Sequence, residues 1–354
     1  MTCPHCEASP VFHGRTVHIW APQQHTLAKL DRACAGTWAT HTNPADMHIR
    51  LDDIDHGPIA AKLAEVLTEP EQRDSRLVVT AGETVTAAHI PAVLSVDSYI
   101  TTVHGAWLED ILGEERLNFA FQPIVDVERR VHGHEALVRA ATRDGNAISP
   151  AQLFGAAGTP SLLATLDRQA RLSAVAHMPA MPDGTRLFIN FMPSTIYDPV
   201  YCLQSTAKAV DAQGMDPASV VFEVVESDKT RDADHLKTIV DFYRSHGYSV
   251  ALDDFGTGYN NLSTLLDFRP NYIKIDKTIT GRLNGDSTSR GLVRDLVGQA
   301  RDQGTRVIAE GIETEADFAI CVELGVEFLQ GFYFAKPAPR FFTDADMAAA
   351  PARS

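Results

Sequence analysis

Eight short runs rich in β-branched and aromatic residues recur along the last two-thirds of this 354-residue sequence, and they constrain its fold more than any other feature. They lie at residues 118–126, 132–140, 186–191, 220–226, 249–255, 272–276, 306–312 and 327–335. From the second run onward, a longer segment with the apolar spacing of an amphipathic helix separates each run from the next. Strand and helix alternation over about 220 residues predicts an α/β fold, a parallel (β/α)8 barrel.

The first two runs are joined by residues 127–131 alone, which read VERRV. A crossover between parallel neighbours needs a dozen or more residues, usually with a helix, and this link is too short for one. We therefore expect the opening pair to form an antiparallel hairpin, so that the barrel has an antiparallel first strand.

The residues before the barrel have a different composition, since nine of the fourteen histidines lie before residue 115. Strand-like and helical segments alternate here and predict a small α/β module. The strand-like segments are residues 16–20, 46–51 and 76–81, and the helical segments are residues 25–35 and 57–68.

Residues 95–115 carry apolar side chains at helical spacing, which predicts a connecting helix with one apolar stripe. The stripe consists of Val96, Ile100, Val103, Trp107 and Ile111. The resulting domain prediction is a module of residues 1–94 that could be sensory, a connecting helix of residues 95–116, a barrel of residues 117–340 and a tail of residues 341–354.

Charge and cysteine usage exclude several classes of protein. The formal net charge is −15, and this charge repels polymeric nucleic acid. No apolar run reaches the roughly 18 residues of a membrane span, and the segment MTCPHCEASP lacks the apolar core of a signal peptide. Five cysteines, an odd number, do not describe a secreted disulfide framework. We expect a cytoplasmic protein with reduced thiols, no membrane span and no nucleic-acid polymer as partner.

Polar residues interrupt or end the predicted strands, although a strand buried on both faces should be apolar. They are Glu135, Asn190, Glu226, Asp253, Asp254, Lys274 and Glu310. In a barrel of this kind the carboxyl ends of the strands converge on one mouth, where active sites lie. Oxygen ligands without His or Cys suit Mg²⁺ or Mn²⁺, and two such ions ~3.5–4 Å apart can clamp a phosphodiester. One such acid alone is more often a helix cap, but the whole set predicts a two-metal hydrolase.

The motifs of this region resemble those of the EAL family of cyclic di-GMP phosphodiesterases, named after a Glu-Ala-Leu triplet that stands here at residues 135–137. FQPIVD precedes the triplet, and the family's further motifs follow it in the family's order. They are Asn190, FEVVES at 222–227, DDFGTGY at 253–259, IKID at 273–276, AEGIET at 309–314 and QG at 330–331. The resemblance covers residues 117–340.

The resemblance implies a role for each matching residue. The ligands that it implies for one metal ion are Glu135, Asn190, Glu226 and Asp253. It implies that Asp253 bridges to a second ion, which Asp254 and Glu310 also bind. Lys274 matches the lysine that holds the attacking water, and Glu310 is counted with it as catalytic. The implied substrate contacts are Gln122, Leu137, Arg139 and Gln330.

The function implied is metal-dependent hydrolysis of cyclic di-GMP to linear pGpG, with two Mg²⁺ or Mn²⁺ ions. The alternative is a catalytically silent sensor that binds the dinucleotide or a protein. We also expect a homodimer, because the apolar stripe of residues 95–115 can pack on a second subunit. Two departures from the family pattern are the sequence FMP at 191–193 in place of Leu-Ser-Pro, and Val225 where Thr is common. Neither removes an implied ligand, so the enzyme is the favoured prediction.

Cys3 and Cys6 have the spacing of a zinc knuckle or a redox pair, and Cys34 with nearby histidines could complete a Zn²⁺ site. A single CxxC with no second pair is a weak signal. We expect an unliganded polar terminus and keep the Zn²⁺ site as the alternative.

Overall fold

The computed structural model of this chain describes residue 12 and residues 14–143, 145–224, 233–255, 265 and 267–349. The chain divides into two compact units. The first consists of residues 1–116 and 140–166, and the second consists of residues 117–139 and 167–354. Cys3, Cys6 and Glu226 lie outside the described residues, so the predictions made for them stay predictions.

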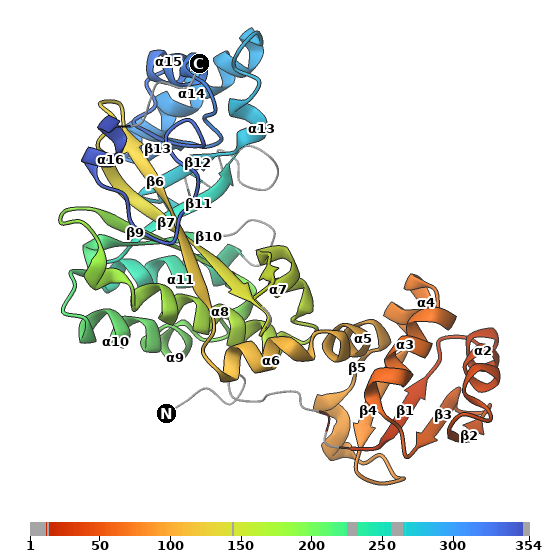
Figure 1. The fold of residues 1–354 in the computed structure, drawn as a ribbon. Coiled ribbons are helices and arrows are strands. Elements are labelled where there is room, and N and C mark those ends of the chain that lie inside the picture. The colour runs from red at the N-terminus through yellow and green to blue at the C-terminus, as the bar shows by residue number, and fades with distance from the viewer. Residues whose placement is uncertain are drawn as a thin grey trace. The chain divides into compact units, whose positions relative to one another are not determined.

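The first unit contains a five-stranded antiparallel sheet with the strand order β2-β3-β1-β4-β5. The strands are β1 (Thr16–Trp20), β2 (Ala39–Asn43), β3 (His48–Asp52), β4 (Arg76–Thr80) and β5 (Leu94–Ser95). The helices are α2 (Gln24–Cys34), α3 (His56–Val66) and α4 (Glu69–Asp74). This chain order is the β-α-β-β-α-β arrangement of ferredoxin-like folds (Figure 1). The predicted small α/β module is confirmed.

The core of this module forms because alternate residues of each strand face the same side. Val17 and Ile19 of β1 share one buried cluster with Leu30 of α2 and Ile59 of α3, so both helices cover the same face of the sheet. Strand β2 was not predicted, since its sequence ATHTN is almost entirely exposed and carries no apolar alternation.

The connecting segment forms two helices, α5 (Val96–His104) and α6 (Ala106–Gly113), so the prediction of one continuous helix is wrong. The break lies at Gly105, where a Cβ atom would come within 2.5 Å of the carbonyl oxygen of Ala156. Only glycine allows this close approach, so a residue with a side chain cannot stand at this position without a shift of the backbone. Val96 and Ile100 of α5 belong to the core of the N-terminal module.

The second sheet closes into a barrel. Its strand order is β6-β14-β13-β12-β11-β10-β9-β7-β8. A further pairing of β6 with β7 closes eight of these strands into a ring, and the short β8 pairs only with β7. The strands are β6 (Asn118–Asp126), β7 (Val131–Ala141), β8 (Ala147–Ile148), β9 (Arg186–Phe191), β10 (Val220–Val224), β11 (Ser249–Phe255), β12 (Tyr272–Ile275), β13 (Arg306–Ala309) and β14 (Phe328–Gln330). β6 is antiparallel to both of its neighbours, and β7 and β9 to β14 are parallel. The predicted eight-stranded barrel with an antiparallel first strand is confirmed.

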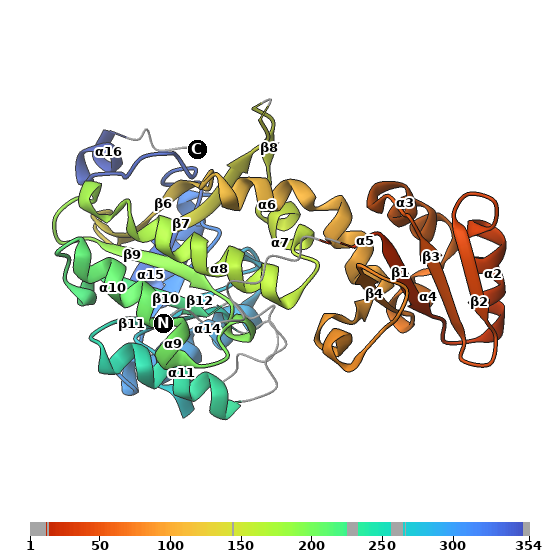
Figure 2. The ribbon, with the colours of Figure 1, turned by 90° about the horizontal axis from the view of Figure 1, so that it is seen from below.

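Helices lie outside the barrel strands (Figures 1 and 2). They are α8 (Pro160–Val175), α9 (Pro199–Cys202), α10 (Gln204–Ala212), α11 (Ala233–Ser245), α13 (Lys277–Thr280), α14 (Ser287–Asp302), α15 (Glu315–Glu323) and α16 (Asp344–Ala349), whereas α7 (Pro150–Ala156) belongs to the first unit. Within the described part of the chain, no helix has the length and apolar character needed to cross a membrane.

His132 of β7 should make the free energy of unfolding of this protein depend on pH. Its ring stacks on Phe328 with 3.9 Å between centroids, and its Nε2 lies 3.0 Å from the Tyr272 hydroxyl. Burial, together with the neighbouring Arg186 and Arg306, lowers the pKa of His132 to about 3. The folded protein therefore keeps this imidazole neutral at a pH where the unfolded chain takes up a proton.

We expect His132 to reduce the free energy of unfolding as the pH falls through 6.5 toward 3. At pH 5 the loss amounts to about 2 kcal/mol relative to pH 7. Urea denaturation of the wild type and of His132→Phe at pH 7 and pH 5 measures this loss. Between the two pH values, the free energy of unfolding of the variant should fall by about 2 kcal/mol less than that of the wild type. Equal losses in the two proteins would show that His132 is not the source.

Candidate active site

A layer of polar side chains crosses the barrel directly above a layer of apolar ones. The apolar layer consists of Ile124, Phe188, Val221, Ala251, Tyr272, Ile308 and Phe328. Since strand side chains alternate with a period of two, the residue two positions further along each parallel strand faces the interior again. These residues are Asn190, Glu223, Asp253, Lys274, Glu310 and Gln330, and β7 adds Glu135 in the same way above Gly133. Six of the predicted site residues thus meet at one level.

Lys274 lies at the centre of this layer and is fully buried. Its Nζ is 2.7 Å from Glu310, 3.1 Å from Glu223 and 3.3 Å from each of Glu135 and Asp253. Burial alone would lower the pKa of the ammonium, but the four carboxylates outweigh it and raise this pKa well above its usual value. The lysine is therefore charged at neutral pH.

One ammonium does not neutralise four carboxylates. Burial raises the pKa of Glu223 well above its usual range, and it also raises the pKa of Asp253. Burial raises the pKa of Glu310 to about 7, although Lys274 opposes this shift. Without a further cation, the layer keeps protons on some of its acids at neutral pH.

Glu135 accepts hydrogen bonds from two side-chain amides of this layer. Its Oε1 accepts a bond of 2.9 Å from the Asn190 amide, and its Oε2 accepts one of 2.7 Å from the Gln330 amide. Burial would raise the pKa of Glu135, but Lys274 and these two amides together lower it. Glu135 is thus held as a carboxylate in a fixed orientation.

Asp253 and Asp254 both approach the layer because β11 is irregular there. Successive residues of a regular strand point to opposite faces. The pairing of β11 with β12 shifts register between Leu252 and Phe255, and Asp254 has a left-handed backbone with φ of 52°. Such a bulge redirects side chains. As a result, Asp253, Asp254 and Glu310 each offer an oxygen within 4.8 Å of the others.

The donor set fits divalent cations. The three acids of β11 and β13 form the cluster within the described residues that could hold a metal ion. Beside them, both carboxylate oxygens of Glu223 are buried and accept no hydrogen bond from the described residues, although one forms the ion pair with Lys274. Oxygen donors of this kind suit Mg²⁺ or Mn²⁺. Cations at this place would replace the protons that burial now favours.

Residues 106–337 of the chain match the EAL domain. The chain belongs to the EAL domain family. The match takes in all eight barrel strands and the whole polar layer.

Two curated relatives have names that state an activity. One is a probable cyclic di-GMP phosphodiesterase of Escherichia coli, PdeG, which is 32% identical over 61% of this chain and 44% of its own length. The other is a cyclic di-GMP phosphodiesterase of Pseudomonas aeruginosa, which is 29% identical over 78% of this chain and 48% of its own length. The chain therefore spans less than half the length of these relatives.

Solved structures of EAL proteins superpose on this barrel. A standalone EAL protein from Vibrio cholerae, in its form bound to c-di-GMP, has 30% identity and a TM-score of 0.60. It covers 66% of this chain, which in turn covers 98% of it. The MucR phosphodiesterase in complex with c-di-GMP has 27% identity and a TM-score of 0.58 over 66% of this chain and 96% of its own.

The predicted substrate contacts of this EAL domain border the polar layer. Gln122 of β6 pairs in register with Glu135, and its side-chain oxygen accepts a bond of 3.3 Å from Gln330. Leu137 and Arg139 lie two and four positions beyond Glu135 on β7, and both are half-buried. They therefore continue the face that carries Glu135 toward the barrel mouth.

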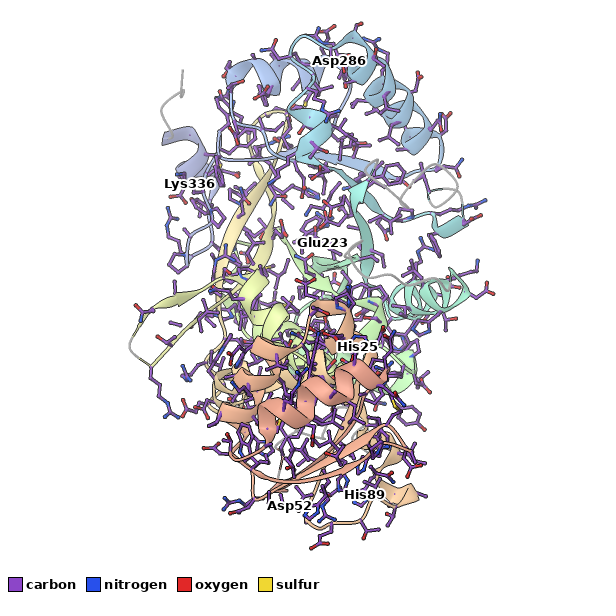
Figure 3. The ribbon with its side chains drawn as sticks, turned by 90° about the vertical axis from the view of Figure 1, so that its right-hand side faces the viewer. His25, Asp52, His89, Glu223, Asp286 and Lys336 are labelled. Carbon is purple, nitrogen blue, oxygen red and sulfur yellow. The ribbon has the colours of Figure 1, made fainter. Side chains whose placement is uncertain are left out.

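Glu223 is the site residue that the sequence analysis missed. Its position on β10 is level with Asn190 of β9, and it is fully buried in the barrel (Figure 3). The side-chain alternation of a strand could have identified it, because Glu223 stands two positions after the inward-facing Val221, just as Asn190 stands two positions after Phe188. The sequence analysis chose Glu226, which does not follow this alternation because it stands three positions after Glu223. Glu226 lies outside the described residues.

Replacing Glu135 by alanine should weaken metal binding and activity together. The change removes a carboxylate and leaves the amides of Asn190 and Gln330 without their acceptor. Even the loss of a group that only orients a metal ligand typically costs ten- to a hundredfold in affinity, so we expect Mn²⁺ affinity to fall by at least about tenfold in calorimetric titration. Unchanged Mn²⁺ affinity together with a large drop in melting temperature would assign Glu135 to the fold.

Proposed function

We propose that this protein is an enzyme that hydrolyses one phosphodiester bond of cyclic di-GMP to give linear pGpG, and that it requires Mg²⁺ or Mn²⁺. The observation that carries this proposal is the buried lysine among four carboxylates at the mouth of an EAL barrel. The names of the relatives support the substrate, since they are cyclic di-GMP phosphodiesterases.

The proposed ligands of the cations are Glu135, Asn190, Glu223, Asp253, Asp254 and Glu310, with Glu226 retained from the sequence analysis. When bound, two divalent cations would stabilise negative charge on the phosphate and lower the pKa of a water molecule. Lys274 would hold and orient the attacking water, and Glu310, 2.7 Å away, fixes the position of the ammonium. Arg139 would bind a substrate phosphate at the mouth, and Gln122 and Gln330 would orient the dinucleotide.

The second candidate function is a catalytically silent sensor of the same dinucleotide. Loss of the lysine or of an acid of the second metal site would favour it. Lys274, Asp253, Asp254 and Glu310 are all present and near one another, so the enzyme remains the better supported proposal.

The decisive experiment is incubation of the purified protein with cyclic di-GMP and Mg²⁺ or Mn²⁺, followed by chromatography of the products. We expect pGpG with either ion, no product after exhaustive chelation, and inhibition by Ca²⁺, which is larger and more loosely coordinated. Full activity after chelation would contradict metal dependence. Binding of the dinucleotide with no turnover under any of these ions would favour the sensor.

We also propose that the enzyme is a homodimer and that residues 1–114 regulate it. The alternative is that these residues are a passive dimer clamp or a localisation tag. Sedimentation of the full chain tests the first statement. Turnover of a chain lacking these residues, compared with the full chain at the same dimer fraction, tests the second. Cys34, which the sequence analysis offered as a further Zn²⁺ ligand, is buried, and burial raises the pKa of its thiol to about 11.

A further inference from the structure

A polar cluster lies in the apolar layer between the barrel and its helices, outside the polar layer of the mouth. Its centre is an ion pair on α8, in which an Nη of Arg171 lies 3.1 Å from Oδ2 of Asp167. Both side chains are at least 97% buried. A buried ion pair commonly contributes no more to stability than well-packed apolar residues of the same volume. The pair therefore calls for an explanation other than stability.

The Asp167 carboxylate holds the turn that follows β9. β9 ends at Phe191, so the next N–H group, that of Met192, has left the β-ladder. It donates instead to Oδ1 of Asp167 at 3.0 Å. Oδ2 accepts a bond of 2.9 Å from the hydroxyl of Thr195, at the end of the short 3-10 helix η3 (Pro193–Thr195). One carboxylate thus fixes both ends of the turn.

Arg171 holds that carboxylate in place. Its Nε donates to Oδ2 of Asp167 at 3.2 Å, and its Nη1 donates to the hydroxyl of Thr206 on α10 at 3.2 Å. The guanidinium is planar and rigid, so a fork of this kind fixes the orientation of the carboxylate. The turn after β9 is in this way tied to two helices, α8 and α10.

The turn carries the end of the strand that presents Asn190 to the site. Asn190 lies two residues before Met192 and donates to Glu135 at 2.9 Å. We propose that Asp167 and Arg171 are positioning residues for the metal-binding side of the mouth. They fix the end of β9, and thereby the amide of Asn190 against Glu135. This inference rests on the proposed function.

Two double variants separate positioning from stability. Asp167→Leu with Arg171→Met replaces the pair by apolar side chains and removes the acceptor for the Met192 N–H group. Asp167→Asn with Arg171→Met removes the same charges but keeps a side-chain oxygen for that N–H group. The two variants share the methionine at position 171 and differ at position 167, where leucine is larger than asparagine and lacks this acceptor. The probe is Mn²⁺ alone, titrated calorimetrically into the metal-free protein of residues 1–354.

We expect the Leu/Met variant to bind Mn²⁺ about tenfold more weakly than the wild type, in line with the effect of groups that orient metal ligands. The Asn/Met variant should stay within about twofold, as expected when the hydrogen bond to Met192 is kept. Melting of the metal-free proteins shows whether both are folded. Equal Mn²⁺ affinity in two folded variants would overturn the proposal.

If the Leu/Met variant does not fold, amide hydrogen exchange in the Asn/Met variant tests the proposal instead. In the metal-free, folded Asn/Met variant, peptides spanning residues 190–196 should exchange as slowly as in the wild type, because the acceptor is kept. Faster exchange there would overturn the proposal, and so would a wild type that binds no Mn²⁺. A wild type that binds Mn²⁺ without hydrolysing cyclic di-GMP contradicts the proposed function instead.

Discussion

Lys274→Met is expected to lower the rate of cyclic di-GMP hydrolysis by at least about a thousandfold, within the range by which a positioned proton-transfer group accelerates a reaction. The ammonium is fully buried and lies within 3.3 Å of four carboxylates, so no neighbouring cation among the described residues takes its place. Methionine fills a similar volume without the charge. The measurement is turnover of cyclic di-GMP at saturating Mn²⁺.

Binding of the dinucleotide should survive this change, because the proposed substrate contacts Gln122 and Arg139 lie on other strands. Calorimetry with cyclic di-GMP in the presence of Ca²⁺ measures that binding. Lys208→Met on α10 is the matched control, since Lys208 is exposed and touches no residue of the site. If Lys274→Met turned over at near the wild-type rate, the lysine would be structural and the proposed mechanism wrong.

The barrel could be predicted because each of its strands is an apolar run with helical segments around it. The antiparallel pairing of β6 with β7 followed from the length of the segment between them, since the five residues 127–131 are too few for the crossover connection that parallel neighbours need. The break at Gly105 could not be predicted, because it depends on the approach of Ala156, which is 51 residues away in the chain. Strand β2 could not be predicted either, because its position is fixed by pairing with β3 and not by burial.

The same contrast applies to the site. Glu135, Asn190, Asp253, Lys274 and Glu310 stood out as polar residues in apolar runs. The choice between Glu223 and Glu226 needed the register of β10 against β9, which pairs Glu223 with Asn190. The Asp167–Arg171 pair gave no signal at all, because two charged residues four apart on a helix usually form a solvated surface pair.

Glu223→Gln is expected to abolish most of the stabilisation that Mn²⁺ gives to the fold and to lower hydrolysis by about a hundredfold, at the upper end for the loss of a group in a metal site. Burial raises the pKa of Glu223 well above its usual range, which favours the neutral acid in the metal-free protein. Glutamine has nearly the same shape as that acid. The metal-free variant should therefore melt within a few degrees of the wild type.

Glu226→Gln is the matched comparison, since it changes the other glutamate of the same segment in the same way. Because Glu223 already lies level with Asn190 and 3.1 Å from Lys274, we expect the smaller loss of Mn²⁺ stabilisation for Glu226→Gln. Melting of both variants with and without Mn²⁺ decides between them. If Mn²⁺ stabilised Glu223→Gln as much as the wild type but did not stabilise Glu226→Gln, Glu226 and not Glu223 would be the metal ligand. Loss in both would mean that β10 and the residues after it contribute two carboxylates to the site.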